Sequence, residues 1–147
     1  MASDPKPDAA CGPPNVAFKV TLDKTQHPTP APPGGKAMLY VFGYGTLAID
    51  GEWVGAVSGV DNYFPLPIDP GEHHLCARFD GRSAYGPQLS KIKGVALHSL
   101  DAKSGQTYYV DIRETSGSSP GFALDLIDPD EGRYRLASST FSTSRPK

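Results

Sequence analysis

The sequence predicts an all-β protein: a two-sheet antiparallel β-sandwich of the immunoglobulin-like or transthyretin-like kind, with about eight strands and a short C-terminal helix or turn. Three observations support this. Gly and Pro contribute 16 and 15 of the 147 residues, and many stand singly between short apolar runs, as turn residues do in all-β folds. Several of these runs alternate apolar and polar residues, the period of a half-buried strand. Apolar residues at helical spacing are nearly absent.

The strands are expected in the short runs that these turn residues separate. Val16, Phe18 and Val20 alternate with polar or small residues, which indicates a strand with one buried face. Pro65 and Pro67 cannot donate to a ladder, so they mark their run as an edge strand. The expected strands cover 16–22, 37–42, 47–50, 52–57, 62–66, 72–79, 95–100, 106–114 and 122–127.

The run 37–42 differs from the others because both of its faces are apolar. Met38 and Tyr40 lie on one face, and Leu39 and Val41 lie on the other. A short run of this kind is typical of a central strand that is covered on both sides. By contrast, the alternation in 106–114 places Tyr108, Val110 and Ile112 inward and Tyr109, Asp111 and Arg113 outward.

Two dipeptides predict tight turns. Asp50-Gly51 lies between two strand-like runs, a strong hairpin signal. In Pro70-Gly71, proline presets a φ of about −65° and glycine supplies the positive φ of a type II turn. The strand that follows carries His73, Leu75, Ala77 and Phe79 on one face and His74, Cys76 and Arg78 on the other.

The chain is long enough for one domain with a real core. We expect a flexible Pro-rich tail over 1–14, a single β-sandwich domain over 15–137, and a frayed Ser/Thr-rich tail over 138–147. Within the domain, the Pro-rich stretch 25–35 is expected to be an extended connector between sheets, or alternatively a peptide-like docking segment. Asp128 is placed to cap a short helix over 129–137.

The two cysteines bear on the compartment. The opening residues are polar and contain no hydrophobic core, so no signal peptide is present in this sequence. The protein is therefore either cytosolic or exported after removal of a signal. A pair of cysteines, Cys11 and Cys76, is what one disulfide requires, although free thiols remain the alternative. We favour the disulfide and an exported protein, whether periplasmic, cell-surface or secreted.

Composition argues against a nucleic-acid partner and against a transmembrane segment. The formal net charge is −2 and no block of Lys or Arg exists, which argues against nucleic acid. No run of eighteen apolar residues is present, so no transmembrane segment is expected.

A set of turn and strand motifs occurs in a recognisable order. It comprises Gly35-Lys36-Ala37-Met38-Leu39-Tyr40-Val41-Phe42, Ile49-Asp50-Gly51-Glu52-Trp53-Val54-Gly55, Tyr63-Phe64, Pro70-Gly71-Glu72-His73, Gly105-Gln106-Thr107-Tyr108-Tyr109-Val110 and Asp130-Glu131-Gly132. Over about residues 34–137 this resembles the bacterial family called domain of unknown function 2846. Residues 73–76 and the C-terminal 142–147 are similar to an acidobacterial-type subgroup. The resemblance implies an exported protein, often lipid-anchored, with no established activity.

No catalytic constellation stands out in the sequence. Asp50, Asp69 and Glu72 all lie in turns, where such residues bond the local backbone. We therefore expect no enzyme, no cofactor and no metal. The alternatives are a small hydrolytic or metal-binding protein that uses His73, His74 and Glu72, and a metal site formed by His74, Cys76 and His98.

Aromatic residues are the remaining candidates for function. Outward or loop aromatics on a β-sandwich can stack on sugars or anchor a partner, although they also cover core edges beside turns. The sequence thus favours a non-catalytic binding or envelope-associated module whose partner is another envelope protein or a glycan. The candidate binding residues are Trp53, Tyr63, Tyr85 and Tyr109, with Tyr44 as a further loop aromatic.

Overall fold

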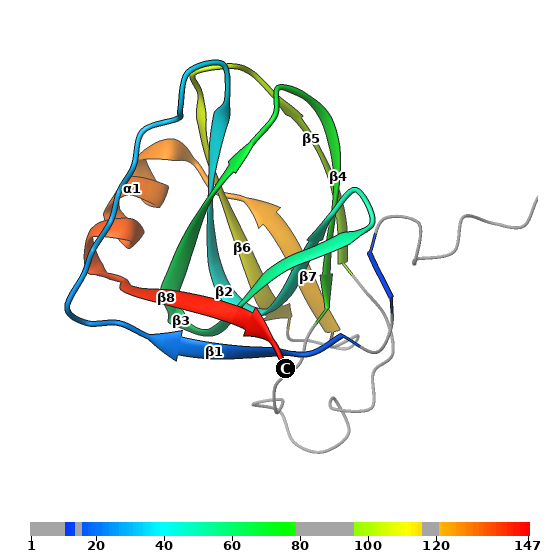
Figure 1. Ribbon diagram of the computed structural model, residues 1–147, viewed down its shortest axis with the longest axis vertical. Coiled ribbons are helices and arrows are strands. Elements are labelled where there is room, and N and C mark those ends of the chain that lie inside the picture. The colour runs from blue at the N-terminus through cyan, green and yellow to red at the C-terminus, as the bar shows by residue number, and fades with distance from the viewer. Residues whose placement is uncertain (1–10, 14–15, 79–95, 116–120) are drawn as a thin grey trace, which may run out of the picture.

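The computed structural model describes residues 11–13, 16–78, 96–115 and 121–147. Within them the chain forms eight strands and one helix, and Figure 1 shows the strands wrapped around a common interior with the helix outside. The all-β fold class is therefore confirmed. The elements are β1 (Phe18–Leu22), β2 (Ala37–Ile49), β3 (Glu52–Ile68), β4 (Gly71–Arg78), β5 (Ala96–Ala102), β6 (Thr107–Thr115), β7 (Gly121–Leu126), α1 (Pro129–Ser138) and β8 (Thr140–Pro146).

The strands belong to one continuous mixed sheet and not to two separate antiparallel ones. Its main path is β1-β8-β3-β2-β4-β5, and β6 joins β2 and carries β7. Two pairs, β2 with β6 and β3 with β8, are parallel, and the others are antiparallel. The sandwich-like shape arises because this single sheet folds over itself.

Strand β2 makes this possible by changing its neighbour along one edge. Its residues 38–43 pair with β6, whereas its residues 46–49 pair with β4. At the change, Gly43 and Gly45 have φ values of 108° and 147°. A Cβ atom at Gly43 would overlap the carbonyl oxygen of Ile112, so the close approach of β6 at the bend requires glycine.

The side chains of β2 alternate between the interior and an outer apolar layer. Leu39 and Val41 point into the main core, where they pack with residues of β3, β4 and β6. On the outer face of the first half lies an aromatic cluster that is covered by α1 and the Pro-rich connector. This outer cluster consists of Met38, Tyr40, Phe42, Tyr63, Tyr109 and Leu136.

The second half of β2 is covered by the N-terminal segment 11–13. Cys11 is bonded to Cys76 of β4 and packs on Ala48, so the predicted disulfide is confirmed. The bridge spans 65 residues, which corresponds to about 4 kcal/mol of stabilisation in the chain-entropy model. Trp53 donates its indole N–H to the Pro13 carbonyl at 2.7 Å and lies under the Arg78 guanidinium at 4.4 Å.

The predicted Asp50-Gly51 hairpin and the helix start are also confirmed, and Gly71 has the positive φ that was expected of it. Asp50 and Gly51 join β2 to β3 with φ values of 53° and 87°, the two positive φ angles of a type I′ hairpin. Gly71 has a φ of 122° at the start of β4. The Asp128 side chain accepts hydrogen bonds from the first free N–H groups of α1.

Four expectations need correction. Residues 138–147 are not a frayed tail, because most of them form β8 between β1 and β3. Its small inward residues replace apolar contacts with hydrogen bonds: Ser142 donates to the Tyr63 carbonyl, and Ser144 accepts from the Ala56 N–H, both at 3.0 Å. The expected strands 37–42 and 47–50 are one strand, β2, and the expected strands 52–57 and 62–66 are one strand, β3. Residues 11–13 are fixed against the domain, whereas the rest of the predicted tail lies outside the described residues.

In the described part of the chain, no helix is both long and apolar enough to cross a membrane.

The bend in β2 gives a first prediction. Gly43→Ala should lower the free energy of unfolding by about 3 kcal/mol. The alanine would have to adopt a positive φ, and its methyl group would overlap backbone atoms of β6. Gly59→Ala is the control, since a Cβ atom there meets nothing within 4 Å, and its effect should stay within about 0.5 kcal/mol. Urea unfolding of the two variants measures the difference, and equal effects would contradict this account of the bend.

Candidate functional site

An open cavity of about 570 Å³ lies outside the sheet, where the Pro-rich connector, β2, β6 and α1 meet. We call it the connector pocket. In Figure 1 the connector runs past α1 on the same side of the sheet. Its volume falls in the range of small-molecule sites. The pocket is lined by His27, Thr29, Pro30, Ala31, Pro32, Tyr40, Thr107, Tyr109, Arg133, Leu136 and Ala137.

The connector forms one wall of the pocket and is held by two tyrosine hydroxyls. Tyr63 donates to the Pro28 carbonyl at 2.9 Å, and Tyr40 donates to the Pro30 carbonyl at 2.7 Å. Prolines offer carbonyl oxygens but no N–H groups, so the segment cannot join the sheet and binds through its carbonyls instead. Burial raises the pKa of Tyr40 and of Tyr63 to about 12, so both hydroxyls keep the protons that they donate.

Tyr109 of β6 belongs to the floor of the pocket. One face of its ring stacks on Tyr40, with ring centroids 5.5 Å apart, and the helix backbone at Gly132 packs on the ring as well. The residue is 6% exposed. No described residue forms a hydrogen bond with its hydroxyl, which is not among the buried unpaired atoms and so remains accessible from the pocket. Burial raises the pKa of Tyr109, and the positive charge of Arg133, which also lines the pocket, opposes that rise.

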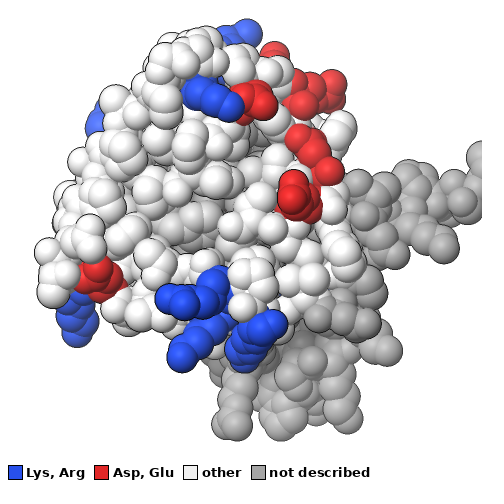
Figure 2. All heavy atoms as spheres, viewed as in Figure 1, with Lys and Arg blue, Asp and Glu red and all other residues white. Residues whose placement is uncertain are grey.

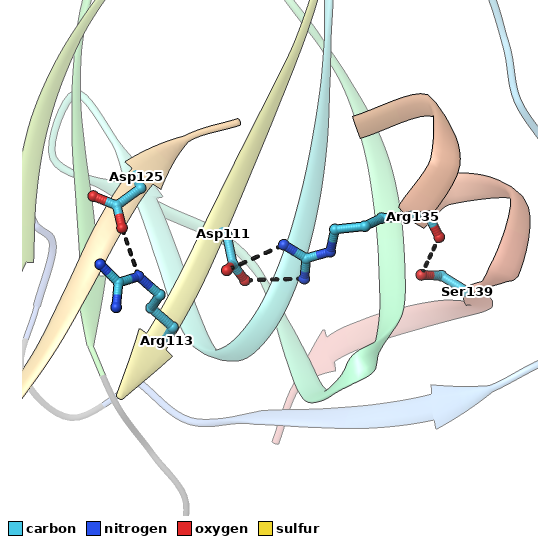
Figure 3. A network of polar contacts seen from close by, with 5 residues as sticks. All are labelled: Asp111, Arg113, Asp125, Arg135 and Ser139. Atoms are coloured by element: carbon cyan, nitrogen blue, oxygen red, sulfur yellow. Dashed lines mark hydrogen bonds and ion pairs between the residues drawn. The ribbon is translucent and has the colours of Figure 1, made fainter. Parts of the chain in front are cut away.

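Helix α1 forms the opposite wall, and Figure 3 shows how it is fixed to the sheet. Arg135 makes two contacts with the Asp111 carboxylate of β6, at 3.1 and 3.2 Å, and its guanidinium lies 4.9 Å from the centre of the Phe42 ring. The Ser139 hydroxyl donates to the Arg135 carbonyl at 2.6 Å, which satisfies a free carbonyl in the last turn of α1. Such a two-point ion pair between half-buried groups holds the helix in one orientation.

The candidate binding residues of the sequence are not gathered in one place. Tyr109 lines the pocket, and Tyr63 lies beside it and holds the connector. Trp53 lies away from the pocket and holds the N-terminal segment. Tyr44 is half-buried in β2, and Tyr85 lies outside the described residues.

The proposed hydrolytic set does not converge. His73 is 13% exposed, and both of its ring nitrogens contact oxygens at 2.6 Å, one in the Asp50 carboxylate and the other in the Asp69 carbonyl. A carbonyl and an ionised carboxylate only accept, so this geometry fits an imidazolium that donates twice. Glu72 and His74 are exposed on the other face of β4.

The alternative metal set is also separated. The sulfur of Cys76 is in the disulfide. His98 pairs with Leu75 in register, so it lies on the opposite face of the sheet from His74. Among the residues that the structure describes, no three His, Cys, Asp or Glu side chains are grouped to hold a metal ion.

Basic side chains gather at one edge of the molecule. Figure 2 shows Lys and Arg together where Figure 1 places β1 and the end of β8. Lys19 and Arg145 are direct cross-strand partners there. Like charges in such a position destabilise the pair slightly, but charges on an edge strand also prevent its pairing with another chain.

Tyr109 is the one lining residue that the sequence reasoning named as a candidate, and among those that it missed Tyr40 and Arg133 matter most. Tyr40 was assigned to a central strand only because its run is apolar, although its polar hydroxyl beside a Pro-rich segment could have indicated the contact. Arg133 gives no such signal, because an arginine on a short polar helix is ordinary. Its position is set by the packing of α1 on β6.

Comparisons of this chain with protein-family models, with curated proteins and with solved structures found no match.

The contacts of His73 predict a pH dependence. Burial disfavours the charged ring, but the bonds to Asp69 and Asp50 outweigh it and raise the pKa of His73 above its ordinary value. A raised pKa in the folded state stabilises the fold fully below about pH 6.5, and this contribution is lost as the pH rises through the folded-state pKa. The free energy of unfolding should therefore fall between pH 6 and pH 9, by on the order of 1 kcal/mol.

Two variants isolate this effect. His73→Gln should remove most of the fall, and Asp50→Asn should reduce it while it preserves the turn, since asparagine tolerates a positive φ. Denaturant unfolding at several pH values measures the slope. Parallel profiles for the wild type and His73→Gln would contradict the assignment of an imidazolium.

The packing of α1 on Tyr109 gives a further prediction. Gly132→Ala raises helix propensity by about 1 kcal/mol, but its methyl group would overlap the Tyr109 ring, which is buried and cannot move away. We expect a net loss of about 1–2 kcal/mol in unfolding free energy. Tyr134→Ala, at a helical position that is 76% exposed, should change stability by less than about 0.5 kcal/mol. A stabilised Gly132→Ala protein would refute this contact.

Proposed function

We propose that the protein is a non-catalytic, exported binding module and that its ligand occupies the connector pocket. The observation that carries the proposal is the hydroxyl of Tyr109, which lies on a side chain more than nine-tenths buried and has no partner among the described residues. The hydroxyl itself is open to solvent, since among the described residues the buried side-chain polar atom without a partner is Thr46 Oγ1. A hydroxyl left open in a cavity of about 570 Å³ supports a ligand that supplies the partner.

The shape and chemistry of the pocket support a small organic ligand. Its walls combine apolar surfaces from Pro30, Pro32 and Leu136 with a few polar groups, the usual composition of such sites. A glycan unit of one or two rings, the partner class that the sequence favours, matches this volume and this mixture.

The histidine geometry supports a binding role over a catalytic one. A general base needs a nitrogen that is free to accept a proton, and both nitrogens of His73 already face acceptor oxygens. The carboxylate of Asp50 is used in the same network, where it also accepts the His74 N–H at 2.8 Å.

The disulfide supports the exported location, because such bonds persist in oxidising compartments. We also propose that the chain is a member of the domain of unknown function 2846 family, on the ordered motifs of residues 34–137.

The proposal is tested by blocking the pocket. Ala137 is an exposed residue of α1 on the pocket lining, so Ala137→Trp should fill the cavity without disturbing the core. The probes are a panel of neutral and acidic mono- and disaccharides together with small aromatic acids and alcohols, measured by calorimetry and by NMR. At least one probe should bind the wild type at one site, and the indole should weaken it by about tenfold or more.

Two controls accompany this experiment. Ala137→Ser keeps the cavity open at the same position, and Tyr134→Trp adds an exposed indole outside the lining; both should bind as the wild type does. If no probe binds, or if binding survives Ala137→Trp, the proposed function is wrong.

A further inference from the structure

We infer that the connector pocket selects ligands that carry a carboxylate group, which is bound jointly by the Arg133 guanidinium and the Tyr109 hydroxyl. This inference rests on the proposed function, because it assigns the chemical class of the ligand in the same pocket.

The first step is that two hydrogen-bond donors line the same pocket. Arg133 and Tyr109 both contribute to the lining, from α1 and β6 respectively. Gly132, the residue before Arg133 in α1, packs directly on the Tyr109 ring, which brings these two lining residues into one neighbourhood. A carboxylate has two acceptor oxygens and can receive bonds from both donors at once.

The second step is that Arg133 is available. Its partner is Asp130, one turn earlier on the same helix, and the side chains are 62% and 88% exposed. Ion pairs of this kind between solvent-exposed groups contribute little to stability. A guanidinium also carries five N–H donors, so it can retain Asp130 at one edge while it binds a ligand at another.

The third step concerns charge. Arg133 and His27 are the only lining side chains that can become positive. The first turn of α1 carries the carboxylates of Asp130 and Glu131. Because these would repel a dianionic phosphate, a monoanion suits the site better.

The remaining lining defines the body of the ligand. Pro30, Pro32 and Leu136 supply apolar contacts, and the hydroxyls of Thr29 and Thr107 can bond polar substituents. A compact ring that bears one carboxylate, such as a hexuronate, combines these features.

The experiment uses two matched pairs of probes on the full chain: D-glucuronate against D-glucose, and benzoate against benzyl alcohol. Calorimetry should show that at least one acid binds about tenfold or more tightly than its neutral partner. Arg133→Gln should remove this preference. Arg145→Gln, the same substitution on exposed β8, should retain it.

Two further variants separate this inference from a general charge effect. Asp130→Asn removes the competing carboxylate and should strengthen acid binding by about twofold to fivefold. Tyr109→Phe deletes only the hydroxyl and should weaken acid binding by about threefold to tenfold. Thermal unfolding of each variant establishes that it is folded.

The possible failures are distinguishable. If acid and neutral probes bind equally and Ala137→Trp blocks both, the carboxylate inference is wrong, but the proposal that the pocket is the ligand site is retained. The same conclusion follows if the acid preference survives Arg133→Gln. If no probe responds to Ala137→Trp, the pocket itself is not the site, and both proposals are wrong.

Discussion

Strand β2 is buried on both faces along nearly its whole length, and this constraint shapes the rest of the fold. A strand that alternates Met38, Tyr40 and Phe42 with Leu39 and Val41 cannot leave either face in water. The inner face is buried by the folded sheet. The outer face needs a cover of its own, and two segments supply it: the connector with α1 over the first half, and residues 11–13 over the second half.

The same strand also explains why the sheet is continuous. Two sheets of a sandwich can share a strand only if that strand gives up one neighbour and accepts another on the same edge. Gly43 and Gly45 allow this change, because β6 leaves and β4 arrives where a Cβ atom would collide with backbone. The bend in β2 therefore joins the two layers into one sheet, so no connection between two separate sheets is needed.

The sequence was informative where local chemistry decides structure. Asp50-Gly51 can form few other turns, and Asp128 before Pro129 is a strong helix start, so both features were predicted correctly. The run 37–42 revealed the central strand because its two apolar faces admit little else. Long-range pairing carries no such local signature: nothing around Thr140 indicates a parallel pairing with β3.

Strand β8 and the pocket were missed for related reasons. Ser142 and Ser144 lie at inward positions but satisfy hydrogen bonds there, so the alternation of the strand is not visible as hydrophobicity. Tyr109 was placed on the outer face correctly, yet its burial depends on a helix that packs across it. The side chains of the candidate site are therefore brought together by tertiary contacts that no single segment specifies.

The two outer covers of β2 differ in chemistry, and this difference explains the cavity beside the connector. The N-terminal cover is closed by a disulfide, by the Trp53 indole and by direct packing of Gly12 on that ring. The connector is held at the two proline carbonyls that the Tyr40 and Tyr63 hydroxyls reach. Without N–H groups at its prolines it cannot form a ladder with the sheet, so it spans the surface and leaves space beside α1.

The helix side of that space is fixed more firmly, because Arg135 is paired with Asp111 and Gly132 packs on Tyr109. The walls of the pocket are therefore unequal. Widening of the pocket should therefore begin at the connector and not at the helix, since two neutral hydrogen bonds are easier to exchange than a two-point ion pair over a packed ring.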